Sequence, residues 1–247
     1  MDHLAKQGTQ TAPDVAVVSP TYCEAENIGR LIQTIEGLNL NLMVLVIDDS
    51  SPDETQNIAE KMNQKYGNIV LLKRPRKMGF GTAIRDGFEL LMNQPNPPKY
   101  IITMDADYSH NPKDIPRLLD CAKEGNDLVV GSIYCVGGTA KGWSIIRRIT
   151  SMVANRMAGS IIHLRLTDFT SGFRCYSQRC VQQVLPKLHS QTYEIQIETI
   201  RQAKLQNLMV SETPITFENR KKGKSKLSIT EIMAFSNYIM KVLLRQK

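Results

Sequence analysis

Short apolar runs alternate with amphipathic segments through the first half of this 247-residue chain. The runs are four to six residues long and rich in Val, Ile and Leu, which is typical of strands buried on both faces of a sheet. They cover residues 15–18, 42–47, 69–72, 101–104 and 127–131. Between them, apolar side chains recur at helical spacing, as at Ile28, Ile32 and Ile35. This alternation predicts an α/β fold, a mostly parallel sheet with helices on both faces.

Polar side chains follow three of these runs. Tyr22 and Glu24 come after the first, Asp49 after the second, and Asp105 and Asp107 after the fourth. Because ligands bind beyond the carboxyl ends of parallel strands, we expect these groups to converge on one ligand. The aromatic ring and carboxylate of the first loop can stack on and hydrogen-bond a nucleotide base, and the second loop can accept a donor from the base or the ribose.

Asp105 and Asp107 are two residues apart, so on an extended chain both carboxylates point the same way. Adjacent anionic oxygens repel each other unless a hard cation such as Mg²⁺ or Mn²⁺ lies between them, and such a cation keeps places for substrate phosphates. The pattern therefore indicates a metal-bridged diphosphate. Aspartate is also common where a strand meets a turn, so the Asp-x-Asp tripeptide alone leaves a purely structural role open.

Composition narrows the class of partner. The formal charge of +7 indicates a phosphate-rich partner: a nucleotide, a lipid head group or a nucleic acid. Nucleic-acid binding modules interleave aromatic residues with basic ones, but aromatic residues make up only 6% of this chain. No Gly-x-x-x-x-Gly-Lys-Ser/Thr loop is present, and the first loop is not Gly-x-Gly-x-x-Gly. These absences argue against ordinary P-loop and dinucleotide-binding sites.

The ends and the cysteines indicate a cytosolic protein. Residues 1–14 lack the apolar core of a signal peptide and are expected to be a disordered lead-in. The apolar segment 229–244 carries polar residues and falls short of the roughly 20 apolar residues that span a bilayer. Five cysteines without a Cys-x-x-Cys pair predict reduced thiols.

Five motifs together resemble the dolichol-phosphate (polyprenol-phosphate) mannosyltransferases, inverting family 2 glycosyltransferases of GT-A fold. They are Pro20-Thr21-Tyr22-x-Glu24, Ile47-Asp48-Asp49-x-Ser51-Pro52-Asp53, Lys77-x-Gly79-x-Gly81-Thr82-Ala83, Met104-Asp105-Ala106-Asp107-x-Ser109-His110-x-Pro112 and Asp168-x-Thr170-Ser171-Gly172-Phe173-Arg174. The resemblance implies a single GT-A (Rossmann-like) catalytic domain at 15–227, followed by a C-terminal amphipathic helix at 228–247. Within the domain, residues 15–135 form the nucleotide-sugar half and residues 136–227 the acceptor half.

The resemblance also assigns the donor site. The nucleotide sugar is expected to contact Pro20, Tyr22, Glu24, Ile47, Asp49, Asp105, Ala106, Asp107, Arg220 and Lys226. Mg²⁺ or Mn²⁺ is expected on Asp105, Asp107 and Ser109, and the catalytic groups that stabilise the departing diphosphate are Asp105, Asp107, Arg220 and Lys226. Plain packing is the alternative for Tyr22 and Ile47. The basic run that holds Arg220 and Lys226 is alternatively a solvated loop or a patch facing an anionic membrane.

The acceptor side is expected in the second half. Its predicted residues are Arg147, Arg148, Ser151, Arg174, Gln196 and Glu198. Asp168 is expected to hold Arg174 or the acceptor loop, with a helix or turn cap as the alternative. Residues 137–142 are expected to form a flexible loop. Two positions depart from the family: Cys23 stands where Asn is usual and Ile133 where Arg is usual. Either Arg147 or Arg148 substitutes for that arginine, or activity is lowered.

The implied reaction transfers mannose from GDP-mannose to dolichyl or polyprenyl phosphate with inversion. Alternatives are glucose transfer from UDP-glucose and, because of Ile133, a non-catalytic nucleotide-sugar-binding protein. The implied partners are a membrane surface and a small membrane-anchoring subunit, with no nucleic acid. The expected location is peripheral, on the cytoplasmic face of the endoplasmic reticulum in a eukaryote or of the plasma membrane in a prokaryote. The segment 229–244 either docks there or packs on the core.

Overall fold

A computed structural model describes residues 13–220 together with Tyr238, Met240 and Val242. Most of the predicted lead-in, Lys226 and most of the predicted helix at 228–247 lie outside the described residues. Val242 is helical and buried in the core, and Tyr238 packs against the same core. Over the described part of the chain, every helix is too short or too polar to span a bilayer.

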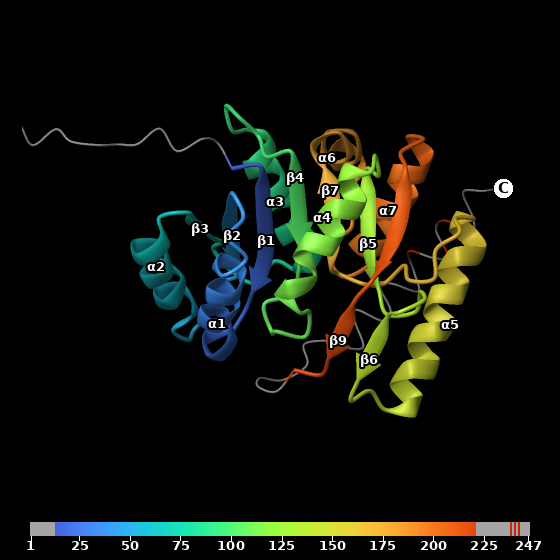
Figure 1. Ribbon diagram of the computed structural model, residues 1–247, viewed down its shortest axis with the longest axis horizontal. Coiled ribbons are helices and arrows are strands. Elements are labelled where there is room, and N and C mark those ends of the chain that lie inside the picture. The colour runs from blue at the N-terminus through green and yellow to red at the C-terminus, as the bar shows by residue number, and fades with distance from the viewer. Residues whose placement is uncertain (1–12, 221–237, 239, 241, 243–247) are drawn as a thin grey trace, which may run out of the picture.

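The main sheet has seven strands in the order β3-β2-β1-β4-β7-β5-β8 (Figure 1). They are β1 Val15–Thr21, β2 Leu42–Asp48, β3 Ile69–Lys73, β4 Tyr100–Thr103, β5 Leu128–Ser132, β7 Arg174–Ser177 and β8 Val210–Pro214. Neighbouring strands are parallel except where β7 runs antiparallel to β4 and β5. The predicted mostly parallel sheet is therefore confirmed, and each of the five predicted strands is present.

Helices cover both faces of this sheet, as predicted (Figure 1). One apolar cluster joins the sheet to α1 Ala25–Glu36, α2 Thr55–Tyr66 and α4 Ile115–Lys123. The other joins it to α3 Phe80–Met92, α5 Ile145–Ile162, α6 Gln178–Val184 and α7 Ile195–Leu205. Two short 3-10 helices, η1 Pro112–Asp114 and η2 Leu185–Lys187, complete the described helices. Successive residues of β1 alternate between the clusters, because side chains on a strand alternate between its two faces.

A second, two-stranded sheet lies beyond the carboxyl ends of β5 and β8, next to α5 (Figure 1). It consists of β6 Thr139–Lys141 and β9 Thr216–Glu218, which run parallel. The expectation of a flexible loop at 137–142 is thus wrong, because the backbone of β6 pairs with a strand 77 residues later in the chain. β9 also contacts the loop after β4, where Glu218 N donates to Ser109 O at 3.0 Å. This contact carries the following residues toward Asp107.

β1 continues through Pro20 instead of ending before it. β1 pairs with β4 only as far as Val18, so at Pro20 no strand remains on that side to require a backbone N–H. Pairing with β2 continues to Thr21 and Asp48. The strand therefore delivers the first loop to the carboxyl edge of the sheet.

Candidate active site

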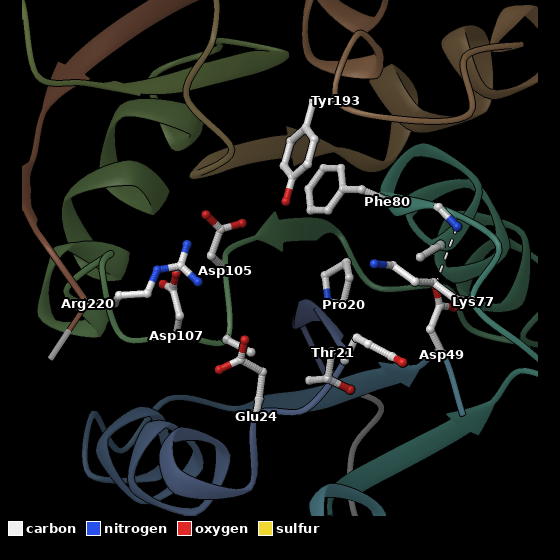
Figure 2. Close-up of a pocket in the computed structure, with 14 residues that line it drawn as sticks. Pro20, Thr21, Glu24, Asp49, Lys77, Phe80, Asp105, Asp107, Tyr193 and Arg220 are labelled. Carbon is white, nitrogen blue, oxygen red and sulfur yellow. Dashed lines mark hydrogen bonds and ion pairs between the residues drawn. The ribbon is translucent and has the colours of Figure 1, made fainter. Parts of the chain in front are cut away.

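A pocket lies at the carboxyl ends of β1 and β2 and beside the loop that follows β4 (Figure 2). It encloses about 690 Å³ of space, part of it open to solvent. Its walls include eight of the ten residues expected to contact a nucleotide sugar: Pro20, Tyr22, Glu24, Asp49, Asp105, Ala106, Asp107 and Arg220. Further walls come from Thr21, Lys77, Gly79, Phe80, Ala83 and Tyr193. Segments from both halves of the chain therefore build one cavity.

Ile47 does not line this pocket. Its side chain is fully buried beneath α3, where a Cβ added at Gly87 would lie 2.6 Å from Ile47 Cδ1. The packing alternative for this position therefore applies to the side chain, and only the Ile47 backbone is left for a ligand. Lys226, the other expected contact outside this list, lies beyond the described residues.

The two adjacent acids at the end of β2, Asp48 and Asp49, have different roles. Asp48 is completely buried and accepts hydrogen bonds from Thr21 Oγ1 at 2.9 Å and Gln56 Nε2 at 2.6 Å, which fastens the first two loops together. Asp49 lines the pocket and forms an ion pair with the buried Arg74, Nη1 to Oδ1 at 2.6 Å. Burial raises the pKa of Asp49, although the charge of Arg74 opposes that rise. Asp49 therefore anchors the segment that carries Lys77.

Asp105 and Asp107 project into the opposite side of the pocket with Arg220 beside them (Figure 2). Arg220 Nη2 lies 2.9 Å from Asp107 Oδ2, and Ser109 N donates to Asp107 Oδ1 at 2.9 Å. Burial would raise the pKa of Asp107, but the Ser109 hydrogen bonds and the Arg220 charge outweigh it and lower that pKa. Burial, aided by the negative charge of Asp107, raises the pKa of Asp105. This end is built to hold negative oxygens next to a cation.

The donor set at this end suits a hard divalent cation. In the described structure, the positive charge beside the Asp107 carboxylate comes from Arg220. The Ser109 hydroxyl is buried and has no partner within the described structure apart from the Asp107 carboxylate, whose pKa it lowers. No three His, Cys, Asp or Glu side chains of the described residues gather around one point, so two carboxylates and this hydroxyl are the oxygen donors at hand. Mg²⁺-like ions bind through one or two carboxylates and complete their shell with water and substrate phosphates.

Six pocket residues were not predicted as individual contacts, and three of them have side chains that shape the pocket. Phe80 and Tyr193 stack, with ring centroids 4.6 Å apart and planes inclined by 10°, and Lys77 Nζ lies 4.8 Å from the centre of the Tyr22 ring. Lys77 stands in one of the five motifs that resemble the family, which is a signal that could have found it. Phe80 carried no such signal, because its partner lies 113 residues away in the sequence.

The start of α3 approaches the loop before α7 closely. Gly81 N donates to Gln191 O at 2.9 Å. A Cβ added at Gly81 would lie 2.7 Å from the carbonyl oxygens of Ser190 and Thr192. Glycine is therefore required at this position to hold Phe80 against Tyr193.

We expect Gly81→Ala to destabilise the fold by about 1–3 kcal/mol, because the added methyl must displace backbone atoms. Urea unfolding followed by circular dichroism measures this change. Gly29→Ala in α1 is the matched control, since its new Cβ would meet side-chain atoms and no backbone, Ile58 Cγ2 at 3.3 Å and Met62 Cε at 3.9 Å. Equal unfolding midpoints for the two variants would contradict the close approach at Gly81.

Three predicted acceptor residues share one side of α5. Arg147 Nη1 donates to Asn219 Oδ1 at 2.9 Å, and its guanidinium lies 4.3 Å from the centre of the Trp143 ring. Burial and the charge of Arg220 lower the pKa of Arg147, while Asp107 raises it. Arg147 therefore lies within electrostatic reach of the acids. Arg148 Nη2 donates to a backbone oxygen of β6 at 3.3 Å, and Ser151 is placed near Tyr134.

Arg174 and Glu198 are not acceptor residues, so these two predictions are wrong. Arg174 is completely buried and donates to Ser171 O at 2.7 Å, Phe169 O at 2.9 Å and Thr199 Oγ1 at 2.7 Å. Such a guanidinium braces the loop before β7 and has no surface left for a ligand.

Glu198 accepts from two backbone donors, His189 N at 3.0 Å and Ser190 N at 2.9 Å. Its carboxylate therefore ties the loop before α7 instead of facing a ligand. Gln196 is buried, and its Nε2 would lie 3.3 Å from a Cβ added at Gly172. Asp168 accepts from Thr170 N and Ser171 N, both at 3.0 Å, which confirms the turn-cap alternative.

Comparisons with known proteins agree with this architecture. The sequence model of glycosyl transferase family 2 matches residues 16–185. A polyprenol monophosphomannose synthase of Mycolicibacterium smegmatis is 33% identical over 218 residues, covering 87% of this chain and 82% of that protein. A dolichol-phosphate mannosyltransferase of Pyrococcus furiosus is 31% identical over 234 residues, covering 93% of this chain. The chain spans only 63% of that second relative's length.

Two solved glycosyltransferase structures share the fold. Glucosyl-3-phosphoglycerate synthase from Mycobacterium tuberculosis, in complex with Mn²⁺, UDP and glucosyl-3-phosphoglycerate, superposes with a TM-score of 0.68 at 17% identity, covering 94% of this chain and 79% of that one. A mannosyltransferase from Pyrobaculum calidifontis, in complex with GDP-Man and Mn²⁺, gives 0.58 at 14%, covering 87% and 59%. At these identities the likeness concerns the fold alone.

Proposed function

This chain belongs to glycosyl transferase family 2, and from that premise we propose that it transfers mannose from GDP-mannose to a polyprenyl or dolichyl phosphate with inversion. The names of its two curated relatives support the acceptor class and the sugar. The observation that carries the proposal is the pocket with two unlike ends. One end has the Tyr22 ring with Lys77 and Asp49, and the other has the paired carboxylates of Asp105 and Asp107 with Arg220 (Figure 2). In this proposal most of the donor site comes from residues 15–135, to which the second half adds Tyr193 and Arg220.

The proposed reaction needs help chiefly for its leaving group. A phosphate monoester is largely dianionic near neutral pH, since its second pKa is about 6, so it attacks the anomeric carbon without a strong protein base. When bound, a divalent metal supplies positive charge to the departing diphosphate. Asp105, Asp107 and Ser109 are the residues that would hold it. Arg220 adds its charge to the same oxygens, which is electrostatic stabilisation and requires no proton transfer.

Labelled-sugar transfer to dolichyl phosphate tests this proposal directly. With GDP-mannose we expect label in a mild-acid-labile lipid product with Mg²⁺ or Mn²⁺, and none above background with excess chelator. UDP-glucose is the parallel donor and should give little product. Transfer from UDP-glucose instead would replace mannose by glucose in the proposal. If GDP-mannose binds but neither donor gives a lipid product, the proposed acceptor is wrong. If GDP-mannose does not bind, the proposed donor is wrong.

A membrane surface is part of the proposal, because α5 exposes apolar side chains beside its arginines. Ile145 and Ile146 are 78% and 79% exposed, and Ile149 and Met152 are about half exposed. Such a face suits peripheral contact with a bilayer that contains the lipid acceptor, with or without a small anchoring subunit. The same transfer assay can be run with the acceptor in sedimentable vesicles. Centrifugation then shows whether the protein sediments with the vesicles.

A further inference from the structure

The residue where the family usually has Arg cannot supply a charge here. The Ile133 side chain packs against the apolar cluster between the sheet and α1, α2 and α4. Its backbone N–H points to Asp168 Oδ2 at 3.4 Å, so the start of this loop is held in place. Any polar contact to a ligand from the loop after β5 must therefore come from a different residue.

Tyr134 is the next residue, and the proton of its hydroxyl group finds no acceptor among the described residues. The hydroxyl oxygen is buried, and among the described residues only the Ser151 hydroxyl acts on it as a donor, which leaves the phenol's own proton without an acceptor. A buried polar group without a partner costs free energy, so such a group usually has a ligand or water to bind. The backbone N–H of Tyr134 is already satisfied by Ser132 Oγ at 3.1 Å. Only the phenol group is therefore left to bind something else.

The surroundings of this hydroxyl are cationic. Burial raises the pKa of Tyr134, whereas Ser151, Arg148 and Arg147 act in the opposite direction. The net rise keeps the phenol protonated at neutral pH, so it acts as a hydrogen-bond donor. The two guanidinium groups and the Ser151 hydroxyl that act on Tyr134 are donors of the kind that suit a phosphate dianion.

Arg147 connects this group to the acid end of the pocket. The charges that act on Arg147 are those of Arg220, Asp107 and Tyr134. Its guanidinium also lies over Trp143 and 5.4 Å from the centre of the Phe217 ring, which fixes its position beside β9. A phosphate held between Tyr134 and Arg147 would therefore lie on the acceptor side of the donor diphosphate.

We propose that the Tyr134 hydroxyl donates a hydrogen bond to the phosphate of the lipid acceptor and so takes over part of the role of the missing arginine. The inference rests on the proposed function and deepens it, because it names a residue of the acceptor subsite beyond those predicted. In this proposal Tyr134 contacts the phosphate headgroup of the lipid acceptor and does not contact the nucleotide-sugar donor. A hydrogen bond to a charged group corresponds to roughly a 10- to 100-fold difference in affinity.

Tyr134→Phe removes only the hydroxyl and tests the assignment. We expect the KM for polyprenyl phosphate to rise by about 10- to 100-fold, with the KM for GDP-mannose, GDP affinity by calorimetry and the melting temperature unchanged. A short-chain polyprenyl phosphate and the matching polyprenyl alcohol serve as competitive inhibitors. The variant should weaken inhibition by the phosphate and leave inhibition by the alcohol unchanged. Tyr66→Phe on α2, on the opposite face of the sheet, is the matched control and should equal the wild type.

A wild-type acceptor KM in Tyr134→Phe would overturn the assignment while leaving the proposed function intact. Equal weakening toward phosphate and alcohol, or a joint loss of donor and acceptor affinity, would assign Tyr134 a structural role and also overturn it. If the wild-type protein uses no polyprenyl phosphate at all, the proposed function fails and this inference fails with it.

Discussion

Asp107→Asn is expected to lower the rate of sugar transfer by about 10²- to 10³-fold while the fold stays intact. The amide oxygen can still accept from Ser109 N, which Asp107 does at 2.9 Å, so the loop after β4 keeps its shape. The charge is lost, and with it the ion pair to Arg220 and half of the carboxylate pair available to a metal. Losing one preorganised electrostatic group at a developing charge typically has an effect of this size.

Initial rates across a Mn²⁺ titration, together with Mn²⁺ affinity from electron paramagnetic resonance, measure the Asp107→Asn effect. Asp120→Asn is the control, because it removes a carboxylate from the exposed surface of α4, where its ion pair with Lys123 spans 3.7 Å. Such surface pairs contribute about 0–1 kcal/mol. Metal-dependent turnover retained in Asp107→Asn would remove Asp107 from the metal site.

Arg174→Met is expected to destabilise the protein by about 3–5 kcal/mol. The guanidinium has no exposed surface, and it donates to Ser171 O, Phe169 O and Gln196 O. Methionine fills a similar volume but leaves these buried acceptors without donors. A loss of this size is a large part of the roughly 5–15 kcal/mol by which folded domains are stable.

Chemical denaturation of Arg174→Met, compared with that of Arg179→Met, separates a structural role of Arg174 from a role in ligand binding. Arg179 is on the surface, and its nearest carboxylate, Asp127 Oδ2, is 3.9 Å away, so its removal should change stability by less than about 1 kcal/mol. If Arg174→Met unfolds like the wild type but shows a raised KM for the lipid acceptor, the acceptor role predicted for Arg174 returns.

Sequence patterns predicted most of the sheet because buried parallel strands read as continuous apolar runs. β7 was not predicted, because it is not a continuous apolar run. It is only four residues long, it begins with the charged Arg174, and it pairs with β4 and β5 through contacts that no local pattern reveals. β6 and β9 are three residues each and form only by pairing with one another.

The site shows the same division between local and distant information. Asp49, Asp105 and Asp107 follow strands, so the strand pattern alone brought them to one edge of the sheet. Which acid of the pair after β2 reaches the pocket depended on Thr21 and Gln56 binding Asp48. Arg174 looked like a ligand-binding cation until the carbonyl groups around it accounted for its donors.

The amino-acid sequence by itself therefore determined the strand and helix order and the acids at the strand ends, because backbone periodicity and strand polarity are local properties. Only the tertiary structure decided which charged groups face the pocket, because a side chain's partners are set by segments far away in the chain. Tyr193 reaches Phe80 and Arg220 reaches Asp107 across more than one hundred residues. Burial then determines whether a charged group braces the fold, as at Arg174, or reaches the wall of the pocket, as at Asp105.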